Sequence, residues 1–239
     1  IADYAAIDAD SGGGALIDLQ GTITAAAVAI SGGRDIDTFV IRRVAANSPM
    51  TISTVNAADV IRVGSNATSA GNSGGLLSTI VATLTVHGGV DGLANVDLDN
   101  TGVGPAVSGT VSKTSIDGFG MAGPVVYDNV KNLSLRLGGA SDQVTVLSTS
   151  VVTTTTIDLG GGDDGVTVSG VNATLNDIGG LLNLLGGSGT NTLRVDDSGD
   201  LVANAGMVGG SNGNQIFGFG MGSADQTEVS QAAGISYGN

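Results

Sequence analysis

The chain of 239 residues contains no cysteine and no tryptophan, and it has only three prolines. Without cysteine it forms no disulfide, and it cannot build a zinc or iron–sulfur site on thiolate ligands. Glutamate occurs once, at Glu228, against 21 aspartates. Aspartate and glycine oppose helix interiors whereas glutamate and lysine favour them, so the composition argues against a helical protein.

Positive charge is also scarce, because 8 lysines and arginines face 22 acidic residues and leave a net charge of -14. This acidic balance argues against a nucleic-acid partner, which requires a basic face. No apolar run reaches the ~18 residues of a membrane span. The apolar fraction of 41% is too high for a disordered chain.

Glycine is the abundant residue, with 41 copies, and it is accompanied by many Thr, Ser, Asn and Val residues. Such a composition is typical of short strands joined by tight turns. The apolar residues alternate with polar ones, as in Leu133-Ser134-Leu135 and Val144-Thr145-Val146. This period of two indicates half-buried strands, and we therefore expect an all-β protein.

Two long internal repeats organise the chain, and a third one begins near its end. Residues 117–121 recur as 217–221, and residues 125–129 recur as 235–239. Residues 37–41 align with 142–146, and residues 96–102 align with 193–199. We assign the first repeat to 1–117, the second to 118–215 and the start of the third to 216–239.

A shorter period lies inside each long repeat. Glycine pairs at 138, 160 and 186 each stand between two short alternating strands, so one unit spans roughly 22–26 residues. Repeats of this length with two strands are typical of a β-solenoid. We predict a right-handed parallel β-solenoid (β-helix) of about seven rungs, interrupted by looser segments at 102–117 and 200–235.

In such a coil, equivalent residues of successive rungs stack in columns. We expect two inward columns, formed by Leu135, Ile157 and Leu184 and by Val144, Val166 and Leu193. Asp142, Asp164 and Asn191 follow the glycine pairs, where a short polar side chain caps turn amides. The preference for Asp over Glu is then explained by a side chain short enough to reach its own backbone.

The pattern Gly-Gly-x-x-Asp-x-Val-x-Val at 138–146, with the runs at 154–160, 195–200, 218–221 and 235–239, resembles a known class of repeats. It is similar to the tandem β-strand repeats of very large bacterial surface proteins, and more distantly to RTX repeats. The resemblance implies an exported, repetitive, non-catalytic scaffold at the cell surface or outside the cell. RTX repeats bind Ca²⁺ between successive coils, whereas the motifs here lie more than twenty residues apart.

Paired and recurring aspartates are the candidate metal ligands. Oxygen ligands favour Ca²⁺, and the residues to test are Asp37, Asp59, Asp142, Asp163 and Asp164. The competing interpretation is turn chemistry on a solvated edge.

The chain ends suggest a partner, which is the chain itself. Joining Asn239 to Ile1 would continue the repeat almost in phase, so we expect either a head-to-tail homopolymer or a segment of a longer repetitive chain. An open solenoid end exposes unpaired strand edges, and a contact that does not close on itself yields a filament. The residues expected at the junction are Ile1, Tyr4, Ile235, Tyr237 and Asn239.

No catalytic constellation stands out, and we do not expect an enzyme. His87 is the only histidine, and its counterpart in the second repeat is Leu185, which favours a partly packed side chain. We therefore expect a structural protein of a secreted bacterial filament or giant surface adhesin. Two alternatives stay open: a calcium-dependent RTX-like adhesin module, and a β-helix enzyme acting on polysaccharides.

Overall fold

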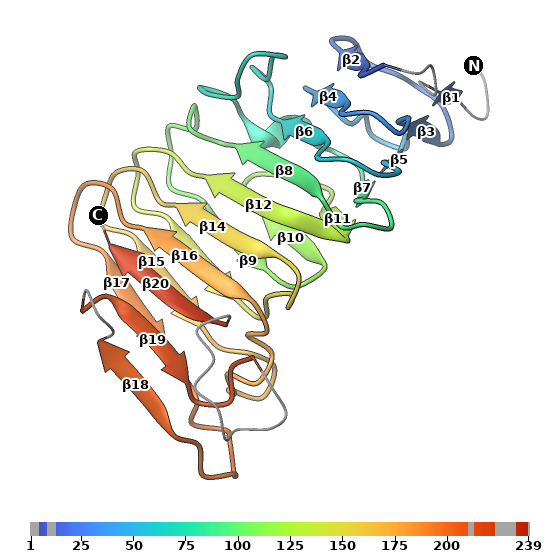
Figure 1. Ribbon diagram of the computed structural model, residues 1–239. Coiled ribbons are helices and arrows are strands. Elements are labelled where there is room, and N and C mark those ends of the chain that lie inside the picture. Colours follow the sequence, from blue (N-terminus) through green and yellow to red (C-terminus); the bar gives the residue numbers. More distant parts are fainter. Residues whose placement is uncertain (1–4, 9–12, 210–212, 223–232, 239) are drawn as a thin grey trace. The chain divides into compact units, whose positions relative to one another are not determined.

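The computed structural model describes residues 5–8, 13–209, 213–222 and 233–238. These residues form an all-β protein with two mostly parallel sheets (Figure 1). The part of the chain described here has no α-helix, and its one helical segment is the short 3-10 turn η1 at Leu77–Thr79. The all-β prediction is confirmed at this level.

The chain divides into two compact units. Unit 1 comprises residues 1–103 and 114–136, and unit 2 comprises residues 104–113 and 137–239. These units do not follow the repeat boundaries placed at 117 and 215, because the repeats describe the sequence and the units describe the packing. Each unit contains one part of each sheet.

In unit 1, the odd-numbered strands form one sheet and the even-numbered strands form the other, except that β10 lies in the sheet of the odd strands. The odd strands pair in parallel, and β10 is added antiparallel to β11. The even strands are all parallel. In spatial order the first sheet contains β1 (Ala5–Asp8), β3 (Val28–Ser31), β5 (Met50–Ser53), β7 (Leu84–His87), β11 (Val125–Asp128) and β10 (Ser115–Gly118), and the second contains β2 (Leu16–Leu19), β4 (Thr38–Ile41), β6 (Val60–Val63), β8 (Ala94–Asp99) and β12 (Val130–Arg136).

Unit 2 is built in the same way. Its parallel pairs are joined by one antiparallel strand, β19, which lies between β20 and β18. In spatial order the first sheet contains β9 (Ser108–Val111), β13 (Gln143–Val146), β15 (Gly165–Val168) and β17 (Thr192–Val195), and the second contains β14 (Thr154–Asp158), β16 (Leu181–Leu185), β20 (Gly234–Gly238), β19 (Gln215–Gly218) and β18 (Gly206–Gly209).

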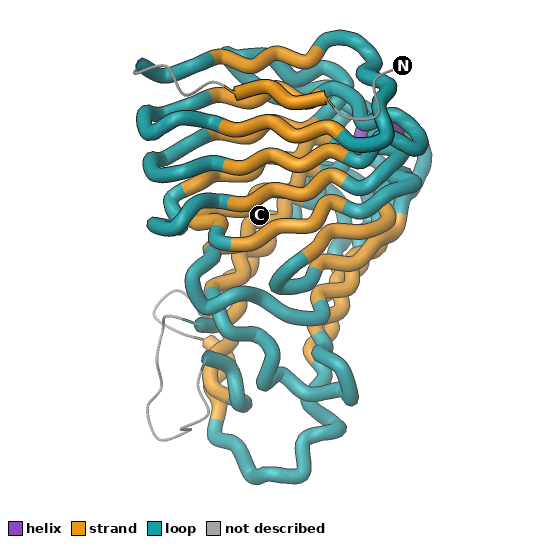
Figure 2. The backbone as a smooth tube through the Cα atoms, turned by 90° about the vertical axis from the view of Figure 1, so that its right-hand side faces the viewer, coloured by secondary structure: helices purple, strands orange, loops and turns teal. Residues whose placement is uncertain are grey.

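The predicted apolar columns are present where one unit contains them. Val166 of β15 pairs in register with Val144 on one side and with Leu193 on the other, and Ile157 pairs with Leu184. Val144, Val166, Ile157 and Leu184 are buried. In Figure 2 the strands run side by side and the connecting turns gather at the strand ends. Parallel pairing in register therefore turns a period-two sequence into continuous apolar rows.

The two segments expected to be looser contain strands where they are described, and residues 210–212 and 223–232 of the second segment lie outside the described residues. Residues 102–117 contain β9 and the start of β10, and residues 200–235 contain β18, β19 and the start of β20. The antiparallel pairs also depart from an all-parallel fold. These short strands are rich in Gly and Ser, so they lack the apolar alternation that marks the others. Their tight turns contain Phe119 and Phe219, whose φ angles of 54° and 51° are rare for a bulky residue.

Glycines allow the turns of unit 2 to stack backbone on backbone. The Gly138 carbonyl accepts a hydrogen bond from Gly161 N–H at 3.0 Å, and the Gly160 carbonyl accepts one from Ser188 N–H at 2.9 Å. A Cβ on Gly160 would overlap the Gly138 carbonyl oxygen, and a Cβ on Gly187 would overlap the Gly160 carbonyl oxygen. Both residues also adopt positive φ, at 80° and 66°.

We predict that Gly160→Ala and Gly187→Ala each lower the free energy of unfolding by about 1–3 kcal/mol, because alanine opposes both the backbone conformation and the close approach. Gly139→Ala is the matched control, since no atom lies within 4 Å of a Cβ built there. Chemical denaturation measures the difference. Equal stability of all three variants would contradict a stacking role for these glycines.

Candidate functional site

In unit 1, buried aspartates connect successive turns. The carboxylate of Asp37 accepts the N–H of Ala15 at 2.6 Å and the N–H of Gly33 at 2.7 Å. Asp59 stands 22 residues later, and its Oδ1 accepts the N–H of Asp37 at 2.7 Å. Both side chains are almost fully buried. Each aspartate therefore caps a backbone amide of the preceding turn.

The same arrangement recurs in unit 2. Oδ1 of Asp142 accepts the N–H of Val107 at 2.8 Å, and Oδ1 of Asp164 accepts the N–H of Asp142 at 2.8 Å. Oδ1 of Asn191 accepts the N–H of Asp164 at 2.9 Å. We call the five side chains that accept these amides the aspartate ladder: Asp37, Asp59, Asp142, Asp164 and Asn191.

The ladder confirms that these side chains cap turn amides. It corrects the expectation that aspartate is preferred because its short side chain reaches its own backbone. A side chain that reached only its own backbone would leave successive turns unconnected. Instead, Asp59, Asp142 and Asp164 each accept an amide from an earlier turn. Asp37 does both, because one oxygen binds within its own turn and the other binds the turn before. Aspartate fits the short gap between stacked turns.

The second oxygen of three ladder residues is buried without a hydrogen-bond partner. These atoms are Oδ2 of Asp59, Asp142 and Asp164. Burial raises the pKa of all three carboxyls above the ordinary value of 3.8. Asn191 avoids this cost, because its Nδ2 donates to the Gly186 carbonyl at 2.6 Å. The ladder thus tolerates an amide in place of a carboxylate.

A second cap recurs in equivalent positions of the two units. Oδ1 of Asn100 accepts the N–H of Leu77 at 2.9 Å in unit 1. Oδ1 of Asp197 accepts the N–H of Leu175 at 3.0 Å in unit 2. The alignment of residues 96–102 with 193–199 places Asn100 opposite Asp197. The internal repeat therefore preserves an interaction between turns as well as the apolar pattern.

The five candidate calcium ligands are distributed over both units. Asp37 and Asp59 lie in unit 1, whereas Asp142, Asp163 and Asp164 lie in unit 2. Asp163 is exposed, and its Oδ1 accepts the N–H of Thr190 at 2.7 Å. Among the described residues, no three His, Cys, Asp or Glu side chains gather as a group that could hold a metal ion. Calcium binding stays a prediction.

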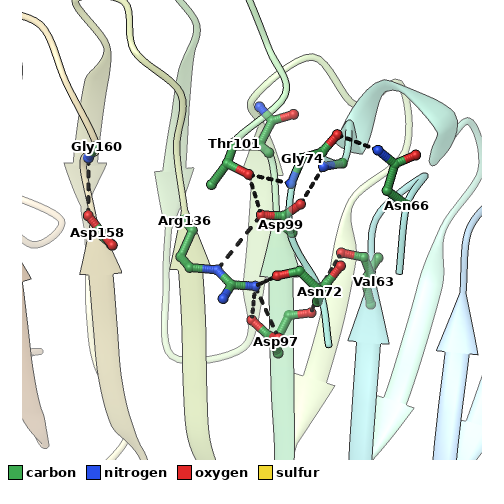
Figure 3. Close-up of polar contacts among 12 residues, drawn as sticks. Val63, Asn66, Asn72, Gly74, Asp97, Asp99, Thr101, Arg136, Asp158 and Gly160 are labelled. Carbon is green, nitrogen blue, oxygen red and sulfur yellow. Dashed lines mark hydrogen bonds and ion pairs between the residues drawn. The ribbon is translucent and has the colours of Figure 1, made fainter. Parts of the chain in front are cut away.

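A polar cluster on β8 and β12 was not found from the sequence (Figure 3). The Arg136 guanidinium lies 2.9 Å from Asp97 and 3.8 Å from the fully buried Asp99. Its Nη2 also donates to the Asn72 carbonyl, and Oδ2 of Asp99 accepts the N–H of Gly75. Burial raises the pKa of Asp97, and the nearby Arg136 opposes that shift. The sequence offered one signal for this cluster: Asp97 and Asp99 alternate along one strand, and the oppositely charged Arg136 lies on another.

The only histidine has a polar partner. Nδ1 of His87 lies 2.8 Å from Oδ2 of Asp128 on the neighbouring strand β11, and the His87 side chain is 47% exposed. A half-exposed ring agrees with the expected partial packing. The sequence did not reveal Asp128 as its partner, because the two residues are 41 positions apart.

Two of the five residues expected at a junction between copies are described. Ile235 is buried against β16, where it pairs with Leu182. Tyr237 is partly exposed, and with Leu184 and Leu193 it lines an open cavity of about 150 Å³ in unit 2. Ile1, Tyr4 and Asn239 lie outside the described residues.

Comparisons of the chain with known protein families, curated proteins and solved structures find no match. The structure itself must therefore support any functional proposal. Within the described residues, no helix combines the length and the apolar character that crossing a membrane requires.

We predict that Asp164→Asn stabilises the protein by about 1 kcal/mol at neutral pH, because it removes a buried charged oxygen that lacks a partner. The raised pKa means that Asp164 supports folding fully below pH 3.8 and loses that contribution as the pH rises through the raised value. The advantage of the variant should therefore vanish in acid. Unfolding measured from pH 3 to 8 tests this.

Two variants separate the charge of Asp164 from its cap. Asp164→Ala removes the acceptor for the Asp142 N–H, so it should cost about 1–3 kcal/mol. Asp163→Asn removes the charge of the exposed neighbouring carboxylate, which contributes least to the raised pKa of Asp164, so it should shift the pH profile only slightly. An Asp164→Asn variant less stable than the parent at pH 7 would show that the unpartnered oxygen imposes no cost.

We also expect EDTA to leave the unfolding temperature unchanged, because the ladder carboxylates already bind backbone amides. Thermal unfolding followed by circular dichroism, with EDTA and then with excess Ca²⁺, measures this. A fall of several degrees in EDTA that Ca²⁺ reverses would support the calcium-dependent adhesin instead.

Proposed function

We propose that this protein is a structural, non-enzymatic repeat protein of a secreted or surface-anchored bacterial filament or giant adhesin. Its chain forms a right-handed parallel β-solenoid, the hand that parallel strand connections adopt in ~98% of cases. It acts outside the cell or at the cell surface, and its partner is another copy of itself.

The observation that carries this proposal is that each turn provides hydrogen-bond partners for the backbone of its neighbours. Ladder side chains accept amides from the preceding turn, and the strands of each unit pair mainly with equivalent strands of neighbouring turns. Stability in such a stack comes from the turn above and the turn below. The last turn of a stack therefore lacks half of its partners until another turn joins it.

The placement of polar groups supports a scaffold over an enzyme. The buried ladder carboxylates face backbone amides, and Arg136 is engaged by Asp97, Asp99 and the Asn72 carbonyl. The chemistry that these groups perform is to hold turns together.

We predict that the purified protein assembles at high concentration into unbranched filaments, because an end that gains strand pairing and apolar cover has no reason to stop after one addition. Negative-stain electron microscopy and light scattering measure this. The net negative charge should make assembly stronger as salt rises, since salt screens repulsion between copies. Monodisperse single particles at all concentrations and salt levels would contradict the proposal.

A further inference from the structure

We propose that two specific strand edges join one copy to the next: β17 and β18 of one copy pair in parallel with β1 and β2 of a second copy. This inference rests on the proposed function, because it assigns the contact through which copies assemble. It commits to a second copy of this chain as the occupant of both edges.

Four strands offer a free edge among the described residues. β17 pairs only with β15, and β18 pairs only with β19. In unit 1, β1 pairs only with β3, and β2 pairs only with β4. β1 and β17 carry the free edges of the first sheet, and β2 and β18 carry those of the second. Each sheet thus has two strands with an unpaired edge, one from unit 1 and one from unit 2.

The chain already contains the pairing that these edges lack. β8 aligns in sequence with β17, and each is followed by three strands of which the middle one is antiparallel to the third. After these three strands, β12 takes the edge of β8 and β13 takes the edge of β9. By the same order, the edges of β17 and β18 await two further strands.

β1 and β2 resemble those two missing strands in the glycines that precede β2 and in their parallel pairing. Glycines 13 and 14 precede β2, as glycines 138 and 139 precede β13. β1 and β2 pair in parallel with strands of their own unit, so both already fit a parallel stack. The direction of β18 also fits, because two successive antiparallel pairings return it to the direction of β20, which is parallel to β16.

Loss of burial marks the edges of β17 and β18. Val111 of β9, which β13 pairs on its edge, is 1% exposed, whereas Val208 of β18 is 66% exposed. Leu193 and Val195 of β17 are only partly covered, although Val166 and Val168, their partners on β15, are buried. The apolar rows of unit 2 therefore continue to an edge that nothing in the described part of the chain covers.

The inward rows limit the register that should form, because inward residues pair with inward residues. Ile7 of β1 pairs with the buried Ile30, and Ile17 of β2 pairs with the buried Phe39. On the receiving side, Val195 continues the row of Val168. Val208 continues the row of Ile216 and Ile235. Extending these rows places Val195 beside Ile7 and Val208 beside Ile17.

Disulfide cross-linking tests this pairing, because the chain has no cysteine of its own. Neighbouring strands lie ~4.8 Å apart, within the range that a disulfide bridges. Val195→Cys protein is mixed with Ile7→Cys protein, and Val208→Cys protein is mixed with Ile17→Cys protein. After mild oxidation, a non-reducing gel measures the linked dimers. Val151→Cys, in an exposed turn, mixed with Ile7→Cys is the control.

We expect both mixtures to give at least tenfold more linked dimer than the control and than either variant alone. Filaments without linkage above the control level would overturn these edges while leaving the proposed function intact. Single particles without linkage would overturn both. A tandem fusion of two copies that links internally, with no linkage between separate chains, would show that the occupant is a continuation of the same polypeptide rather than a second copy.

Discussion

Every turn of this protein depends on its neighbours for hydrogen bonds. Parallel strands donate and accept across turns, and glycine carbonyls in unit 2 accept amides from the turn stacked on them. Few of these contacts are local. In the aspartate ladder, most hydrogen bonds join residues that are at least 22 positions apart in the sequence. A strand removed from this setting would leave its backbone groups unsatisfied, which is costly once water is excluded.

This constraint explains the unusual composition. Glycine allows the close approach of turns at positions such as Gly160 and Gly187, where any side chain would collide with a carbonyl. Aspartate supplies an acceptor on a short stem, and its unpartnered second oxygen is a cost that asparagine avoids at position 191. Asp59, Asp142 and Asp164 carry this cost, because the second oxygen of each is buried without a partner.

The sequence reveals much of the fold, because periodicity and turn chemistry are local signals. The column of Val144, Val166 and Leu193 follows from the alternation and from the glycine pair that precedes each strand, and so does the capping role of Asp142 and Asp164. What escaped prediction depends on distant partners. The strands β9 and β18 carry too few apolar residues to be recognised alone, and their pairing defines them. Arg136 meets Asp97 and Asp99 only because β12 lies beside β8.

The antiparallel strands have a consequence for growth by repetition. Where a strand reverses direction, three successive strands enter one sheet before the chain crosses to the other, so a single such event would leave one sheet two strands ahead. The first reversal, at β10, occurs in the sheet of the odd strands, and the second, at β19, occurs in the sheet of the even strands. In the described part of the chain each sheet therefore receives ten strands. The two reversals therefore offset each other, which the proposed addition of further copies requires if neither sheet is to gain strands faster than the other.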